Sequence, residues 1–316
     1  MGRRVILSLL LILLSVCLLL SAAGCGTDTE MQPFIFFSDT QPDPETGDFT
    51  GVGLMIAEAV ELTGKPEVVI FGGDTVNHGG DEAEWAGFWQ AVNGSLNGVK
   101  TAAVAGNHDN HALLAGQFDL PSAAPAEPGE GWFYSFSAGH VFFIMLDSNI
   151  MGAANQADID WLRAELQSEA AKAAHWRVAV MHHPMWPLSD IPRDLQRAET
   201  LREFFLPLLE EFGIDLILCG HQHVYSRTQP MRGDSALADA DGNGISSRNG
   251  ISSGNGIIQV MVASGDKASY AVSERDFLAA GAEAPNYVRI TADDGSLTII
   301  AFDSEHEEID SFVVRK

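Results

Sequence analysis

The sequence contains little cysteine and little positive charge. Three cysteines occur in 316 residues, and 18 lysines and arginines stand against 43 aspartates and glutamates, which gives a formal net charge of −25. Because nucleic acids and anionic lipid surfaces bind through basic patches, we expect neither as a surface-bound partner. A small phosphorylated substrate remains compatible with this charge, because bound metal ions can hold it.

A long apolar run stands at the N-terminus. Arg3 and Arg4 precede an apolar stretch from Val5 to about Leu20, and small residues then lead to Cys25. A basic start, an apolar core and small residues are typical of an export signal. Small residues before a cysteine resemble a bacterial lipoprotein processing site, although Ala22 stands where leucine is usual.

This pattern predicts where the protein resides. We expect residues 1–24 to be a lipoprotein signal peptide, Cys25 to carry the lipid and residues 25–32 to form a short tether. An uncleaved N-terminal transmembrane anchor is the alternative, because the apolar run is almost long enough to span a membrane. In both cases we expect the rest of the chain outside the cytoplasm, attached to a bacterial membrane and monomeric.

The cysteine positions exclude an internal disulfide in the exported domain. Cys17 lies in the predicted signal and Cys25 is the predicted lipidation site, so Cys219 is the one thiol left. Cys219 ends an apolar run, and we expect a buried small side chain there. Stability must therefore come from an apolar core, which a domain of this size can supply.

Residues 33–316 are predicted to form one α/β domain. Its first part repeats the order strand, polar tip and helix, with strands expected at 33–37, 67–71 and 99–105 and helices at 52–62 and 81–92. We then expect a hairpin (132–137 and 140–146), one amphipathic helix (156–173), a strand (177–181), a helix near 193–212 and a strand (214–219). The last part is expected to hold strands at 256–263, 287–291, 297–302 and 309–314.

A low-complexity loop is expected at about 233–256, where Asn-Gly-Ile recurs every six residues. Four residues there match the first half of a calcium loop (Asp239, Asp241, Asn243 and Gly244), but Gly250 stands where the closing carboxylate belongs, which disfavours calcium. The stretch Gly250–Gly254 matches the elbow of serine hydrolases. We reject that match, because the expected turn from a strand into a helix is missing.

Five strand ends carry metal-ligating types of side chain: Asp39 with Gln41, Asp74, Asn107 with His108, His182, and His221 with His223. The carboxyl ends of parallel strands share one edge of a sheet, so these residues are expected to meet. For His221 and His223 we expect extended backbone, in which side chains two residues apart point the same way. Mixed nitrogen and oxygen donors without cysteine suit manganese, iron or zinc.

The motifs Asp39-Thr40-Gln41, Gly73-Asp74, Gly106-Asn107-His108-Asp109, His182-His183-Pro184 and Gly220-His221-Gln222-His223 resemble those of the calcineurin-like metallophosphoesterase superfamily. The later part of the chain is similar to bacterial relatives of the purple acid phosphatases. The resemblance implies a four-layer αββα sandwich of two mixed β-sheets flanked by helices. It also implies two divalent or trivalent metal ions and a small phosphorylated substrate.

The resemblance assigns roles position by position. Asp74 corresponds to a carboxylate that bridges both metals, Asp39 and His223 to ligands of the first metal, and Asn107, His182 and His221 to ligands of the second. His183 is the other candidate in its pair, but the family places the ligand two residues before the proline. His108 corresponds to a histidine that protonates the leaving group or steadies the phosphoryl oxygens, and Asp109 could orient it.

Two positions depart from the family pattern. Gln41 stands where the first motif usually has histidine, so the first metal is expected to be loosely held or different in identity. Asn77 stands where purple acid phosphatases have a tyrosine, so a coloured iron–tyrosinate enzyme is not expected.

The implied activity is hydrolysis of phosphate mono- or diesters, by a hydroxide that bridges the two metals and without a covalent enzyme intermediate. The alternative is a non-catalytic surface protein that binds a ligand on the same fold, with a site degraded through Gln41.

Overall fold

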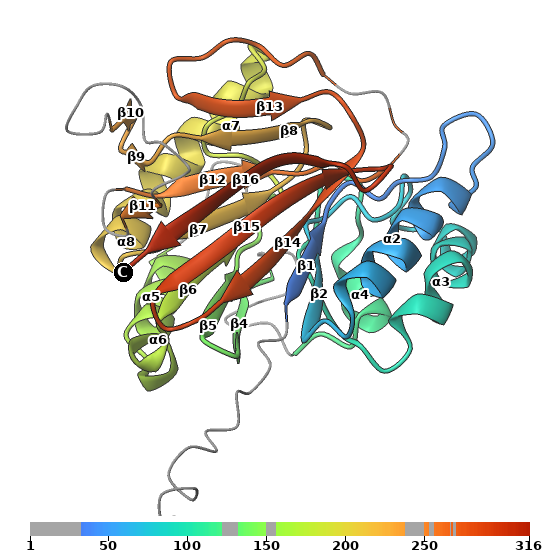
Figure 1. The fold of residues 1–316 in the computed structure, drawn as a ribbon, viewed down its shortest axis with the longest axis horizontal. Helices are drawn as coiled ribbons and strands as arrows, with labels where there is room; N and C mark the ends of the chain where they lie inside the picture. The colour runs from blue at the N-terminus through green and yellow to red at the C-terminus, as the bar shows by residue number, and fades with distance from the viewer. Residues whose placement is uncertain are drawn as a thin grey trace, which may run out of the picture. The chain divides into compact units, whose positions relative to one another are not determined.

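Two seven-stranded sheets form the centre of the protein (Figure 1). The computed structural model describes residues 33–121, 132–149, 156–237, 250–252, 256–265, 267 and 270–316. The predicted signal peptide, tether and lipidation site at Cys25 lie outside these residues, as do the four calcium-loop positions and the rest of 238–249. Among the described residues, no helix combines the length and the apolar character needed to cross a membrane.

Both sheets are mixed. The first has the order β11 (Ile251–Ser252), β16 (Glu308–Arg315), β15 (Ser296–Asp303), β14 (Asn286–Ala292), β1 (Phe34–Phe37), β2 (Val68–Phe71) and β3 (Lys100–Ala103). The second has the order β13 (Leu278–Ala282), β8 (Tyr225–Thr228), β12 (Ile258–Met261), β7 (Leu216–Cys219), β6 (Trp176–Val180), β5 (Val141–Met145) and β4 (Tyr134–Ala138). Strands β1 to β3 are parallel to one another, and so are β5, β6, β7 and β12.

Helices cover the outer face of each sheet. The first sheet carries α2 (Thr50–Thr63), α3 (Glu82–Leu96) and α4 (His111–Gln117). The second carries α5 (Gln156–Leu166), α6 (Glu169–Ala173), α7 (Pro192–Phe204) and α8 (Leu206–Glu211). Two short strands, β9 (Met231–Arg232) and β10 (Ser235–Ala236), pair separately. The predicted four-layer αββα sandwich is thus confirmed.

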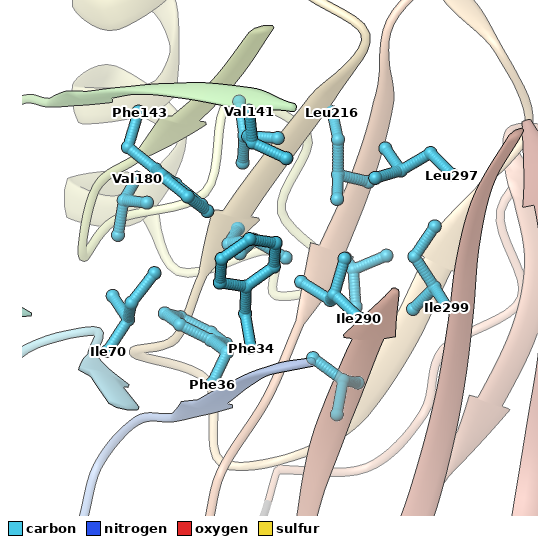
Figure 2. Close-up of a cluster of buried hydrophobic side chains, with 14 of the residues drawn as sticks. Phe34, Phe36, Ile70, Val141, Phe143, Val180, Leu216, Ile290, Leu297 and Ile299 are labelled. Atoms are coloured by element: carbon cyan, nitrogen blue, oxygen red, sulfur yellow. The ribbon is translucent and has the colours of Figure 1, made fainter. Parts of the chain in front are cut away.

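Strand β1 shows how the sequence builds these layers. Phe34 and Phe36 point between the sheets, where they pack with Phe143 of the second sheet (Figure 2). Ile35 and Phe37 alternate with them and pack against the helices of the first sheet. All four side chains are buried, because a strand between two apolar layers has no solvent-exposed face.

Two predicted helices are each divided in the structure. The helix expected over 156–173 ends at Leu166, and the Ser168 side chain then caps α6 by accepting a hydrogen bond from the Ala171 amide. The helix expected near 193–212 breaks at Phe205, because Pro207 has no amide hydrogen to continue the ladder. Helix α4 and strands β8 and β13 were not predicted from the sequence.

Candidate metal centre

The strand ends expected to meet do lie together. The Asp39 amide donates to the Gly73 carbonyl (2.9 Å), and the Gly220 amide donates to the His182 carbonyl (2.9 Å). The Ser264 amide, after β12, donates to the Ser38 carbonyl at 2.7 Å. These bonds join the loops that follow β1, β2, β6, β7 and β12 at one edge of both sheets.

Two groups of candidate ligands share this edge. Asp39, Asp74 and His223 form one, and Asp39 Oδ1 lies 3.2 Å from His223 Nε2. His182, His183 and His221 form the other, and His182 Nε2 lies 3.4 Å from Asp74 Oδ2. Asp74 therefore belongs to the first group and contacts the second.

Both polar atoms of the buried Gln41 side chain lack a hydrogen-bond partner among the described residues. Asp39 Oδ1 and His182 Nε2 are also buried, and their contacts with His223 and Asp74 are ion pairs without hydrogen-bond geometry. Leaving buried polar atoms unsatisfied is costly, so their presence beside two acidic side chains fits a site built for cations. His182 donates from Nδ1 to the Gly72 carbonyl (2.9 Å), which leaves Nε2 with the lone pair that a metal requires.

The backbone of the candidate ligands is strained. Asp39, Asp74, His221 and His223 have φ angles of 52°, 50°, 78° and 49°. The extended backbone expected at His221 and His223 is therefore wrong, since both residues are left-handed. Strained conformations of this kind cluster at functional sites, where the surrounding structure enforces them.

Two glycines allow the loops to approach the carboxylates this closely. A Cβ at Gly220 would lie 2.1 Å from Asp39 Oδ2, and one at Gly106 would lie 2.2 Å from Asp74 Oδ1. A larger residue at either position would push the loop or the carboxylate away. In the Gly106 loop, the His108 amide donates to Asp74 Oδ1 at 2.8 Å.

His183 has different partners from its neighbour. Its Nδ1 lies 2.8 Å from the Ser148 hydroxyl, and its Nε2 contacts the Arg197 guanidinium. A fixed cation beside Nε2 disfavours a metal ion on that atom. The geometry thus agrees with the preference for His182 as the ligand.

His108 and Asp109 have separate roles. His108 donates from Nδ1 to the Asn77 carbonyl (2.9 Å), and its Nε2 lies at the centre. Both oxygens of Asp109 accept backbone amides, from Thr75 (3.1 Å) and Gly106 (2.9 Å). The expectation that Asp109 orients the His108 imidazole is therefore wrong; Asp109 ties two loops of the centre together.

The charges at the centre favour a cation. Burial alone would lower the pKa of His182, but Asp74 and Asp39 raise it to about 9. Burial alone would raise the pKa of Asp74, and the nearby His182 instead holds it below its usual range. Burial and the charge of Asp74 raise the pKa of Asp109 to about 7. A metal ion would replace the positive charge of the His182 proton.

A pocket of about 160 Å³ opens at the centre, and Asn107 is an exposed part of its lining. The pocket adds three residues that the sequence reasoning missed: Arg193, Lys267 and Tyr270. Lys267 Nζ lies 3.3 Å from His108 Nε2. Lys267 follows the strand Ile258–Met261, but the rule applied to the five strand ends selected metal-ligating side chains and so passed over a lysine. Nothing in the sequence singled out Arg193.

A family model described as calcineurin-like phosphoesterase matches residues 32–225. The chain belongs to this family. An uncharacterised protein of Mycobacterium tuberculosis is 30% identical over 150 residues, which are 41% of this chain and 28% of that protein. Purple acid phosphatase 23 of Arabidopsis thaliana is 28% identical over 137 residues, which are 41% of this chain and 29% of that protein. The chain thus spans less than a third of the length of either relative.

Solved structures support the fold. A purple acid phosphatase from yellow lupin seeds has a TM-score of 0.72 at 18% identity, covering 90% of this chain and 54% of that one. GAP50, described as the anchor in the inner membrane complex of Plasmodium, has a TM-score of 0.63 at 17% identity. The match covers 90% of this chain and 89% of GAP50. At this level of identity both show the architecture alone.

Proposed function

We propose that this protein is a phosphoesterase dependent on two metal ions, which hydrolyses phosphate mono- or diesters without a covalent intermediate. The observation that carries the proposal is the gathering of Asp39, His182, His221 and His223 around the buried carboxylate of Asp74. Family membership supports phosphoesterase activity. The dependence on two metal ions is our proposal.

The residues present fit two cations of the manganese, iron or zinc type. Asp39, Gln41 and His223 would hold the first ion, Asn107, His182 and His221 the second, and Asp74 both. When bound, the ions would lower the pKa of a water molecule and neutralise phosphoryl oxygens.

The pocket residues would act on the ester itself. The Asn77 carbonyl fixes the His108 ring, so that Nε2 is held at the pocket next to Lys267. We assign His108 to protonation of the departing oxygen and Lys267 to binding of a phosphoryl oxygen. Cys219 is fully buried and its thiol contacts the Val260 carbonyl, so it is not placed to act as a nucleophile.

The test compares His182→Ala with His78→Ala in the purified protein. His182 is fully buried at the centre, whereas the His78 side chain is 81% exposed beside one carboxylate. We expect His182→Ala to lose metal and turnover of aryl phosphates together, and His78→Ala to keep both. Undiminished turnover by His182→Ala would refute the assignment.

A non-catalytic binding protein is the second candidate, because Gln41 stands where the family usually has histidine. The likeness to GAP50 shows that the fold also occurs in a protein described as an anchor. At most one metal and no turnover with any metal supplement would support this candidate. If the protein is instead an enzyme whose first site binds metal weakly, Gln41→His should reach full turnover at a lower metal concentration than the wild type needs.

We also propose that the protein is exported and attached to a membrane by a lipid on Cys25. The apolar run from Val5 to about Leu20 and the small residues before Cys25 support this. Cys25→Ser should abolish lipid attachment, so that the protein accumulates as a precursor that carries no lipid. Unchanged incorporation of labelled lipid in that variant would refute the attachment site.

A further inference from the structure

A second cluster of metal-ligating side chains lies far along the strands from the candidate centre. His140 Nδ1 and His175 Nδ1 are 3.1 Å apart, and each lies 3.0 Å from Asp294 Oδ1. His140 directly precedes β5 and His175 directly precedes β6, so both stand at the amino ends of strands, and the carboxyl end of β6 leads to His182 of the centre. None of the three belongs to a family motif quoted above.

Strand register brings the two histidines together. Strands β5 and β6 are parallel, with Val141 opposite Trp176, so the residues just before this pair are neighbours. The Trp176 amide donates to the His140 carbonyl at 3.1 Å, which extends the ladder to this point. The two rings stack with centroids 5.3 Å apart and planes at 24°, and both Nδ1 atoms converge.

The third donor comes from the other sheet. Asp294 lies in the turn between β14 and β15, and the Trp176 indole holds that turn by donating to the Asp293 carbonyl at 2.6 Å. The Asp293 carboxylate is already used by the amides of Gly295 and Ser296 and by the Ser296 hydroxyl. Asp294 is therefore the carboxylate that this turn offers to the histidines.

We propose that His140, His175 and Asp294 form a zinc site that bridges the two sheets. Zinc binds imidazole nitrogen and carboxylate oxygen at about 2.0–2.2 Å in tetrahedral geometry, which places donor atoms roughly 3.3–3.4 Å apart. The observed separations of 3.0–3.1 Å are within a few tenths of an ångström of that. Water would complete the shell, since the three side chains are 40%, 47% and 75% exposed.

The surrounding charges suit a dication. Lys316 is a cation next to this cluster, and its Nζ donates a hydrogen bond to the His175 carbonyl. The same Nζ pairs with the Asp215 carboxylate at 3.0 Å, which balances the positive charge of Lys316. The Asp293 carboxylate, in the same turn as Asp294, adds further negative charge beside the cluster. Both imidazole Nδ1 atoms face the same oxygen of Asp294, at 3.0 Å each.

The test counts zinc bound to the full-length chain after equilibration with micromolar zinc and dialysis. The double variant His140→Ala/His175→Ala should hold about one zinc fewer than the wild type. His78→Ala is the matched control, because His78 pairs with one carboxylate, Glu84, at 3.2 Å, and should lose none. Equal zinc in the double variant and the wild type would overturn the proposal.

Two further measurements separate this site from the candidate centre. In a His182→Ala chain the bridging site should still bind about one zinc, whatever the outcome for the phosphoesterase. In that background Asp294→Asn should weaken zinc binding by about tenfold or more, and His175→Cys should retain it because thiolate is also a zinc ligand. Loss of zinc in His175→Cys together with unchanged affinity in Asp294→Asn would contradict the assigned ligands.

Discussion

Gly106→Ala tests how closely the loop after β3 must approach Asp74. The added Cβ would lie 2.2 Å from Asp74 Oδ1 and 2.3 Å from the Asp74 amide nitrogen. Ordinary contacts of this kind are about 3.4 Å, so the loop or the carboxylate must shift by about 1 Å. A misplacement of that size at reacting groups costs roughly a hundredfold in rate. Overpacking should also lower the free energy of unfolding by about 1–3 kcal/mol.

The matched control is Gly94→Ala, in the last turns of α3. A Cβ there meets nothing within 4 Å, so helix propensity alone should raise the free energy of unfolding by about 0.5–1 kcal/mol. The assays are kcat/KM for an aryl phosphate at saturating metal, and urea unfolding. If Gly106→Ala kept kcat/KM within about threefold of the wild type, the close approach to Asp74 would not be needed for catalysis.

Three further substitutions probe other contacts. The Tyr134 hydroxyl bonds the amide (3.0 Å) and the carbonyl (2.8 Å) of Ala103 on an edge strand, so Tyr134→Phe should lower the free energy of unfolding in urea by about 1–3 kcal/mol. A hydrogen bond to Asp147 raises the pKa of His111, so its stabilisation is complete below about pH 6.5 and is lost as pH rises through the higher native pKa. The stability difference between wild type and His111→Gln should thus shrink from pH 5.5 to pH 9, and stay below about 1 kcal/mol because the ring is 40% exposed. Lys267→Met should lower kcat/KM for an aryl monoester by about a hundredfold and for a diester by less, since the diester carries less charge. Equal losses on both esters would show that Lys267 does not respond to phosphoryl charge.

The fold was predictable where burial controls the sequence. Strands such as Val68–Phe71 and Leu216–Cys219 lie between two apolar layers, so every residue is apolar and the strand ends are sharp. The polar residues that follow them stand out for this reason. The strands are also parallel, which is why residues from separate motifs, such as Asp39, Asn107 and His182, lie at one edge with Asp74.

Other parts depend on contacts that local sequence does not contain. The strand Tyr225–Thr228 is polar in sequence but fully buried, because Arg227 pairs with Asp310, 83 residues away in the chain. The helix His111–Gln117 is too short to show a clear helical repeat of apolar residues in the sequence. Only Asn110, which caps it, marks its start. The contacts of Asp109 with Thr75 likewise join separate loops.

The left-handed backbone of the candidate ligands bears on how metal and folding are linked. Strain at Asp39, Asp74, His221 and His223 costs of order 1 kcal/mol each, and less at the aspartates, which tolerate this conformation better than most residues. The buried Gln41 amide, which has no hydrogen-bond partner among the described residues, adds about 1–3 kcal/mol for each of its two polar atoms. The total is comparable with the whole stability of an ordinary domain, about 5–15 kcal/mol. In the proposed metal-bound protein, the cations would offset much of that cost, so removal of metal should destabilise the protein itself as well as abolish the proposed turnover.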